Sequence, residues 1–502
     1  MVCQLDTLRR CKPSIIRKVL DELPTTLGET YERALQGIPK EKRQDAHRVF
    51  QCLAVAIRPL RVEELAELFA IEFDGDAAGP SLKEGRRPDN AEDAVLSACS
   101  TLIAVIKNEN SKTVQFSHFS VKEYLTSDRL RTPEMENICH YHISLDVAHT
   151  ILAQACLAVL LQLDETVDRE RLETLPLAFY AAQHWVDHAK YEDVASRMQD
   201  AIEQLFDPSK PHLAVWTWIH DVDSRQLQGT IHDHPKRPEA TALYYAALCG
   251  LSGLVKYLII THREDVNVNR GRHGTPLHAA SRRGHLDAAR ELLAHGSDVN
   301  TPNGSGSPPL YSAYEGGHLE VMQLLLEHGA DLDVPLNWAR LLLHDAAWRG
   351  RADVVHLLLQ QNANVDARDY YYDTPLHYAS MWGEARVAQL LLESGAAVNA
   401  KNNYGETPLY KASVHGCVEV VQILLRHGAD VHIRAYGTRT PLQDAQTNEI
   451  TQLLLEHCKD DAYATRYLSR ATRLPRAVPH SSSTRCATLP ATPLAFVPFH
   501  IV

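Results

Sequence analysis

The chain has 502 residues, a formal net charge of −12, 45% apolar residues and 23% charged residues. This length predicts about three domains, and the composition is ordinary for a protein that folds in water. The acidic balance argues against direct nucleic-acid binding, which favours basic patches. None of the ten cysteines forms a C-x-x-C pair, so neither a zinc site nor a redox motif is predicted. Because neither a leader sequence nor an apolar run of about 18 residues is visible, we expect an intracellular protein, cytoplasmic or nuclear, that does not enter a membrane.

The first part of the chain alternates short helical and strand patterns. Residues 1–41 are predicted to be helical, and residues 42–130 to form a winged-helix-like domain with three helices and a two-stranded ribbon. The predicted elements are helices at Val49–Ile57, Arg61–Ile71 and from Ser120 to Leu125, a helix that turns into a strand over Ala94–Ile106, and a strand at Val114–His118. Glutamates 63, 64, 67 and 72, on and beside the second of these helices, argue against DNA contact through it.

Several short motifs in this region resemble one family. They are Cys3-Gln-Leu-Asp6, Leu23-Pro24 with Tyr31-Glu32, Arg58-Pro-Leu60, Phe116-Ser-His-Phe-Ser-Val-Lys-Glu-Tyr-Leu125, His149 with Cys156-Leu157, and Tyr180-Ala-Ala with Trp185 and His188. Together they resemble the part that follows the NTPase module in fungal NACHT-ankyrin proteins, relatives of the NOD-like receptors. The resemblance implies a helical linker domain over residues 131–239, after the winged helix.

The resemblance also implies an NTPase module that this chain lacks. No G-x-x-x-x-G-K-[ST] loop is present, so nothing is predicted to cradle phosphates. Residues 1–41 are therefore interpreted as a helical remnant after a missing module, either in a truncated relative or behind a misassigned start. His118 matches the histidine that touches the nucleotide phosphate in the receptors, but here we expect it to be structural. No cofactor is expected.

A fixed period dominates residues 240–458. Leucines recur at positions 243, 277, 310, 343, 376, 409 and 442, so that successive positions differ by 34 once and by 33 at every later step. This constant interval predicts a stacked repeat array. Most copies begin with Thr-Pro-Leu, in which Thr caps a helix, Pro suits its first position and Leu enters the core. A glycine ends the first helix, and a leucine-rich second helix ends at a glycine, or at Asn362 in the fourth copy.

These copies resemble the ankyrin repeat. About seven are expected, with an atypical first copy and a last copy shortened between Ala445 and Leu453, as befits array caps. The fourth copy reads Leu341-Leu-Leu-His344; without a Thr cap, its first helix is expected to start less sharply. The histidines at repeat positions, such as His278 and His377, are expected to be structural, and the Cys139-His-Tyr-His142 cluster is not expected to bind metal. Residues 459–502 are predicted to be a disordered tail.

The sequence also predicts where a partner binds. Positions two, five and six after each repeat leucine are expected to line the concave face of the array, next to fingers formed by the turns. Tyr, Trp and Arg are the residue types that carry most binding energy. The candidate partner-binding residues are Trp338, Trp348, Arg349, Tyr370, Tyr371, Tyr372, Tyr378, Met381, Trp382, Tyr404 and Tyr436.

The predicted fold is thus mostly α: an ankyrin-repeat solenoid preceded by a winged-helix-like domain and a helical linker. No catalytic or metal-binding arrangement is recognisable, which favours a non-enzymatic scaffold or adaptor that binds a protein partner through its repeats. Two alternatives remain open. One is a transcription co-regulator that binds a DNA-bound factor, and the other is a fragment of a nucleotide-dependent signalling switch. Docking of the candidate surface onto the chain's own linker or tail is the alternative to a separate partner.

Overall fold

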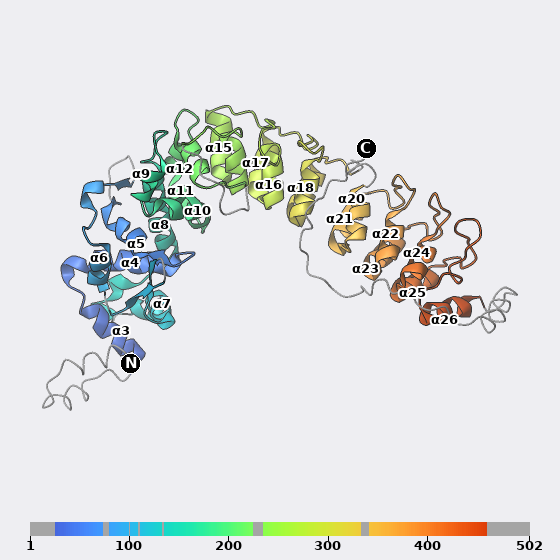
Figure 1. The fold of residues 1–502 in the computed structure, drawn as a ribbon, viewed down its shortest axis with the longest axis horizontal. Helices are drawn as coiled ribbons and strands as arrows, with labels where there is room; N and C mark the ends of the chain where they lie inside the picture. Colours follow the sequence, from blue (N-terminus) through green and yellow to red (C-terminus); the bar gives the residue numbers. More distant parts are fainter. Residues whose placement is uncertain are drawn as a thin grey trace. The chain divides into compact units, whose positions relative to one another are not determined.

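The computed structural model describes the greater part of the chain, in seven ranges: residues 26–73, 80–99, 101–108, 111–132, 135–223, 234–332 and 341–458. Helices make up most of the described residues (Figure 1), and the chain divides into two compact units. The first contains residues up to Leu342 together with His356–Ala363, and the second contains Leu343–Val355 and the residues from Asn364 onward. Most of the predicted 1–41 segment and the whole predicted tail lie outside the described residues. The fold is mostly helical.

The first unit begins with helices around a small sheet. Strand β5 (Lys112–Phe116) pairs with β4 (Ile103–Lys107) on one side and with β1 (Leu60–Arg61) on the other, both antiparallel. The surrounding helices are α3 (Leu27–Gln36), α4 (Arg43–Val55), α5 (Val62–Ala66), α6 (Ala91–Cys99) and α7 (Phe119–Thr126). Phe50, Leu65 and Leu125 are buried between these elements. This is the predicted helix-and-ribbon arrangement, with one additional short strand, β1.

The helix predicted over Arg61–Ile71 is wrong in its length. Helix α5 stops at Ala66, a single 3₁₀ stretch follows over Glu67–Ala70, and β2 (Ile71–Glu72) then pairs with β3 (Ser81–Leu82). Pairing with the next strand of the chain has overridden the local helical pattern. The buried Glu64 carboxylate accepts hydrogen bonds from Arg58 and Arg61, and Glu67 pairs with Arg87. Glu64 and Glu67 are therefore paired with arginines of the same domain, and their charges are a weak argument against DNA binding.

The next six helices form the region predicted as a helical linker. They are α8 (Leu145–Leu160), α9 (Arg169–Glu173), α10 (Ala178–Ala189), α11 (Val194–Arg197), α12 (Gln199–Phe206) and α13 (His212–Ile219). Helix α8 packs against both α4 and α10, so the linker and the winged-helix region share one core. Trp185, Phe206 and Trp216 contact one another within it, edge to face or tilted, with centroids 5.5–6.2 Å apart. Among the described residues, no helix is both long and apolar enough to cross a membrane.

The repeats form antiparallel helix pairs. In order they are α14 (Ala242–Cys249) with α15 (Ser252–Thr261), α16 (Pro276–Arg283) with α17 (Leu286–Ala294), α18 (Pro309–Gly316) with α19 (Leu319–Glu327), α20 (Leu342–Trp348) with α21 (Ala352–Gln360), α22 (Pro375–Trp382) with α23 (Ala385–Glu393), and α24 (Pro408–His415) with α25 (Val418–Arg426). The last copy keeps only its second helix, α26 (Asn448–His457), which confirms the expected truncation.

Left-handed residues separate these helices. The glycines that end the first helices, at 250, 284, 317, 350, 383 and 416, have φ between 68° and 80°. Asn362 has φ 63° at the end of the fourth copy's second helix, as predicted from its place in the repeat. Asparagine is among the few non-glycine residues that adopt this conformation readily.

In three copies, a histidine after the repeat leucine bonds to the turn of the next copy. In His278, Nδ1 accepts from the backbone N–H of Thr275 at 3.2 Å, and Nε2 donates to the carbonyl of Ser307 at 3.0 Å. His377 bonds in the same way to Thr374 and to the carbonyl of Glu406. Burial lowers the pKa of both imidazoles to about 4, so each is neutral at pH 7 and can accept at one nitrogen while donating at the other. Their predicted structural role is confirmed.

The fourth copy departs from this pattern in one bond. Nε2 of His344 donates to the carbonyl of Asp373 at 3.0 Å, but its buried Nδ1 has no hydrogen-bond partner among the described residues. Residue 341 is leucine where most of the other copies have threonine. The expectation that α20 starts less sharply is wrong, because it begins at Leu342, the position equivalent to Pro375. The missing threonine instead removes the hydroxyl, which lies 2.9 Å from Nδ1 of the equivalent His377 in the next copy.

We expect Leu341→Thr to stabilise the fourth copy by about 0.5–2 kcal/mol, because it supplies an N-cap oxygen. The new hydroxyl would also give Nδ1 of His344 the partner that the threonine before His377 provides in the next copy. Urea unfolding followed by circular dichroism measures the change. Leu341→Val, which has a similar shape but no hydroxyl, is the control, and equal midpoints for the two variants would contradict the capping explanation.

Candidate partner-binding surface

Exposed aromatic side chains gather on the second unit. We call Trp348, Trp382, Tyr370, Tyr371, Tyr372, Tyr404 and Tyr436 the aromatic ridge. The five tyrosines are exposed, Tyr370 to 72%, and Trp382 is 54% exposed, whereas Trp348 is half-buried. The tryptophans lie on first helices, and the tyrosines lie in the turns that precede α22, α24 and the last copy. Large exposed rings from several successive copies are more than stacking of the array requires.

Other candidate residues lie elsewhere. Tyr378 is 7% exposed, and its hydroxyl donates to the buried Asp369 carboxylate at 2.7 Å. Its predicted place on the open surface is therefore wrong. The second position after the repeat leucine faces neighbouring elements, as Ala279 and Asp345 also show by their burial. Met381 is half-buried and Arg349 is exposed, and Trp338 lies outside the described residues.

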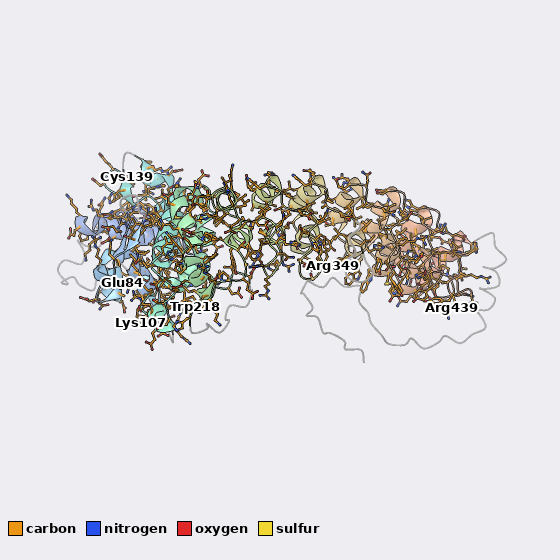
Figure 2. All side chains as sticks on the ribbon, turned by 90° about the horizontal axis from the view of Figure 1, so that it is seen from above. Glu84, Lys107, Cys139, Trp218, Arg349 and Arg439 are labelled. Carbon is orange, nitrogen blue, oxygen red and sulfur yellow. The ribbon has the colours of Figure 1, made fainter. Side chains whose placement is uncertain are left out.

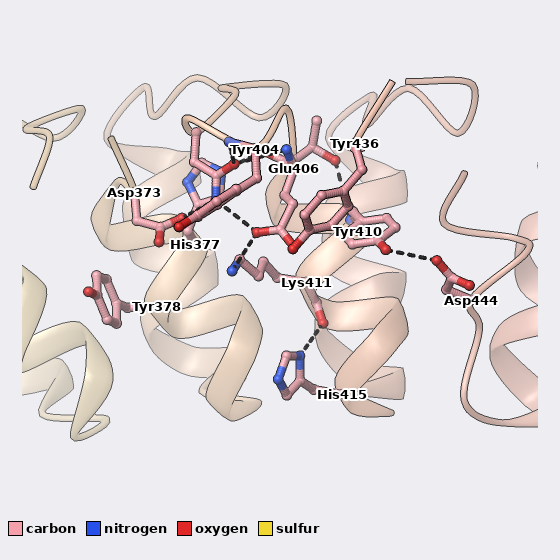
Figure 3. A network of polar contacts seen from close by, with 12 residues as sticks. Asp373, His377, Tyr378, Tyr404, Glu406, Tyr410, Lys411, His415, Tyr436 and Asp444 are labelled. Atoms are coloured by element: carbon pink, nitrogen blue, oxygen red, sulfur yellow. Dashed lines mark hydrogen bonds and ion pairs between the residues drawn. The ribbon is translucent and has the colours of Figure 1, made fainter. Parts of the chain in front are cut away.

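The ridge consists of two patches. In the tryptophan pair, the rings of Trp348 and Trp382 meet edge to face with centroids 5.9 Å apart. Trp382 is the last residue of α22, whereas the turn with Tyr370–Tyr372 comes before the first residue of that helix. An eight-residue helix is about 12 Å long, so the pair and the tyrosine turns lie at opposite ends of the first helices. Figure 3 shows this separation in the next copy, where Tyr404 and Tyr436 lie far from His415, the equivalent of Trp382.

The second patch is the row of tyrosine turns, which we call the tyrosine fingers. Tyr370 and Tyr371 meet at 5.3 Å and 88°, and Tyr404 lies 5.8 Å from Tyr436. Backbone hydrogen bonds join adjacent fingers. The N–H of Asn403 donates to the carbonyl of Tyr371 at 3.0 Å, and the N–H of Tyr436 donates to the carbonyl of Tyr404 at 2.8 Å. The backbones of adjacent fingers are therefore held together in a row.

A buried polar network supports the fingers from beneath (Figure 3). Glu406 accepts from Lys411 at 2.6 Å and from the Tyr436 hydroxyl at 2.9 Å. The side-chain amide of Asn402 donates to both Asp373 and Glu406 at 2.8 Å. Burial raises the pKa of Asp373. At Glu406 burial acts in the same direction, but hydrogen bonds from Lys411, Asn402 and Tyr436 outweigh it and lower the pKa.

Arginines flank the rings of both patches. The guanidinium of Arg349 lies 5.4 Å from the Trp348 ring and pairs with Asp345 at 2.8 Å. Arg368 lies 5.4 Å from the Tyr372 ring. Arg439, labelled with Arg349 in Figure 2, pairs with Asp444 after the last finger. The apolar rings are thus bordered by charge, as at the rim of protein interfaces.

Tyr372 has a strained backbone. Its φ is 62°, in the left-handed region, where Gly405 one copy later has φ 75° and Gly306 two copies earlier has φ 81°. In all three, the N–H closes the same turn onto the carbonyl three residues before. A left-handed conformation costs a side-chain-bearing residue about 1–2 kcal/mol. A bulky residue kept at such a position, with its ring half in solvent, points to a function for the ring.

We expect Tyr372→Gly to raise the free energy of unfolding of the second unit by about 0.5–1 kcal/mol, because glycine adopts positive φ without strain. Tyr371→Gly is the matched control. Tyr371 is equally exposed but has no positive φ, so glycine should destabilise by about 0.5–1 kcal/mol there. Changes of the same sign for the two variants, measured by urea unfolding, would contradict the strain argument.

Other candidate chemistry is not supported by the described residues. His118 caps α7, with Nδ1 accepting from the N–H of Ser120 at 3.3 Å and lying 2.6 Å from its hydroxyl oxygen. That hydroxyl in turn lies 2.7 Å from the hydroxyl oxygen of Tyr31. This is a structural role of the predicted kind. No group of three or more potential metal ligands occurs in the described part of the chain, which includes Cys139–His142.

Comparison with known proteins identifies both halves. A family model for ankyrin repeats matches residues 225–303, 243–335, 297–369 and 343–435. The model described as the winged-helix domain of GPI inositol-deacylase matches residues 31–152. The chain carries ankyrin repeats after a winged-helix domain. Ankyrin repeats imply a role in protein–protein recognition, through the surface that the stacked copies present.

Several known proteins are similar to parts of this chain. The azaphilone pigments biosynthesis cluster protein L of Monascus ruber is 31% identical over 294 residues, which are 55% of this chain and 60% of that protein. Among solved structures, the human ASB11 ankyrin repeat domain is 31% identical, with 43% of this chain and 97% of that one covered and a TM-score of 0.37. The ankyrin repeat domain of Bcl-3, a member of the IkappaB family, is 27% identical, with 43% and 99% covered and a TM-score of 0.41. The assignment to NACHT-ankyrin proteins stays a prediction.

Proposed function

We propose that this chain is a non-enzymatic interaction protein, a scaffold or adaptor, whose aromatic ridge binds a protein partner. The observation that carries the proposal is the set of exposed tyrosines and tryptophans from successive ankyrin repeats. Such rings supply large contact areas, and they lose little conformational entropy when they are buried by a partner. The strained Tyr372 adds support, because folding alone would favour glycine at that position.

The arrangement around the ridge also suits recognition. The fingers are fixed by hydrogen bonds between copies and by the network around Glu406, so little order has to be gained on binding. Arginines lie over or beside the rings, and Arg, Tyr and Trp are the residue types enriched at binding hot spots.

Affinity capture tests this proposal. The full chain and the variant Tyr370→Ser/Tyr371→Ser/Tyr404→Ser are immobilised and exposed to extract of the source cells. We expect proteins retained by the wild type to be lost from the variant, while Ile260→Ser, which alters an exposed apolar residue outside the ridge, retains them. Tyr372 and Tyr436 are left intact because their backbones are strained. Equal capture by all three chains would rule out the tyrosine fingers as the partner site.

A further inference from the structure

We propose that the tyrosine fingers bind an extended proline-rich segment, and that the resident ligand is the chain's own Thr488-Leu-Pro-Ala-Thr-Pro-Leu494. This inference rests on the proposed function, because it assumes that the ridge is a recognition surface. It adds the chemical class of the ligand and a means of regulation, in which the segment covers the fingers until a partner displaces it.

The spacing of the fingers matches that of a proline helix. Tyr371 and Tyr404 occupy equivalent positions in successive copies, in the turns before α22 and α24, which pack against each other. Packed helices lie about 8–10 Å apart. A polyproline II helix repeats every three residues at about 3.1 Å per residue, or roughly 9.3 Å per turn. Prolines three residues apart, such as Pro490 and Pro493, would therefore meet successive fingers in the same orientation.

The chemistry of the fingers suits the same ligand. The tyrosine rings meet in pairs, Tyr370 with Tyr371 and Tyr404 with Tyr436, and all four are exposed, so they offer apolar ring surface against which a pyrrolidine ring can pack. Proline-rich segments dock on aromatic surfaces of this kind because their backbone is extended before binding. Carbonyls in this conformation make no internal hydrogen bonds, and tyrosine hydroxyls can donate to them. The segment from Thr488 to Leu494 carries no charge, so the flanking arginines do not repel it.

The covalent connection favours this segment over a free peptide. Helix α26 ends at His457 in the same unit as the fingers, and the chain from Cys458 to Pro490 joins that helix to the proline segment. A chain of this length can span at most roughly 100 Å, about ten repeats of the array at the helix spacing given above, so the segment can reach every finger. A tethered segment whose connection spans the distance to its site has an effective concentration of about 1 mM. A segment that binds with a Kd of about 0.1 mM would then occupy the fingers about 90% of the time.

Cross-linking within the full chain tests the inference. Cys486 lies four residues before Pro490 and serves as the probe, with Cys3, Cys11 and Cys139 replaced by serine in every variant. A second cysteine is placed in a finger by Lys401→Cys or on the second helix of the preceding copy by Glu393→Cys, both exposed positions. The chains are treated at low protein concentration with a short bismaleimide, and the products are identified by mass spectrometry of the peptides.

We expect several-fold more cross-link from Cys486 to position 401 than to position 393. Pro490→Ala with Pro493→Ala should remove this preference, and excess synthetic peptide covering residues 487–498 should reduce it. Unchanged circular dichroism of each variant shows that the fold is retained. Equal cross-linking at the two positions, or a finger preference that survives loss of both prolines, overturns the inference.

The two proposals fail in different ways. Capture of partners that depends on the tyrosines, without a proline-dependent cross-link to the finger, leaves the proposed function standing and removes the internal ligand. A cross-link specific to the finger, without capture that depends on the tyrosines, supports the internal ligand and contradicts the proposal of a separate partner at the fingers. If both hold, the Pro490→Ala/Pro493→Ala chain should capture more partner than the wild type, because occupancy of the fingers by the segment falls.

Discussion

Leu376→Ala is expected to destabilise the second unit by about 2–5 kcal/mol, the usual result of removing a fully buried leucine side chain. Leu376 has no exposed surface, and α22, which carries it, packs against both α23 and α24. Neighbouring copies share this core, so the loss should extend beyond the fifth repeat. Hydrogen exchange followed by mass spectrometry measures it locally, and amides of α22 to α25 should exchange faster together.

The same substitution at Leu390 is the matched control. Leu390 lies in the second helix of the same copy but is only half-buried, so Leu390→Ala should cost less than Leu376→Ala because less apolar area is returned to water. Equal protection of wild type and Leu376→Ala would show that the assigned repeat register is wrong.

Replacing both Trp348 and Trp382 with alanine is expected to weaken partner capture at least tenfold, about 1.4 kcal/mol. The two rings contact each other edge to face, and residues of this kind near the centre of an interface carry most of its binding energy. The helices should persist, since neither residue is among the buried core side chains. The measurement is titration of a partner isolated by the capture experiment, with circular dichroism of both chains.

His415→Ala is the control for the tryptophan pair. His415 is exposed and stands at the end of α24, one copy after Trp382, so it tests the same helix position without an indole. Retention of full affinity by the double tryptophan variant would place the partner on the tyrosine fingers alone. Because the two patches lie at opposite ends of the first helices, separate losses in the two sets of variants would instead show that the partner spans the concave face.

The sequence predicts the array well because its signals are local and repeated. The four residues Thr374-Pro-Leu-His377 predict a helix cap, the first helical turn, a core residue and a hydrogen bond. The structure contains each of these features. Asn362 is recognisable for the same reason, since its place in the repeat requires a left-handed residue. Features that depend only on one turn and its neighbour can be predicted without knowing the rest of the fold.

The surface was harder to predict because it depends on what lies across from each residue. Tyr378 stands at a position that the repeat pattern assigns to the concave face. Its hydroxyl nevertheless donates a hydrogen bond to Asp369 in the preceding finger, and its ring is buried. The strain at Tyr372 is invisible in the sequence, because tyrosine carries no signal for positive φ. The helix after Arg61 is shorter than predicted because Ile71 pairs with Leu82. No local sequence pattern indicates that pairing.

The hydrogen bonds between copies also constrain how such a chain can change in length. His278, His344 and His377 each reach a carbonyl 29 residues later, and Asn267, Asn300 and Asn399 each reach a glycine carbonyl at the same interval. A deletion or insertion of one whole copy restores every such donor to an equivalent acceptor. Loss of a single codon inside a finger shifts the donors before it by one residue relative to the acceptors after it, so these hydrogen bonds no longer align. The gene for an array tied in this way can therefore lengthen or shorten by whole repeats, and smaller changes are confined to its ends.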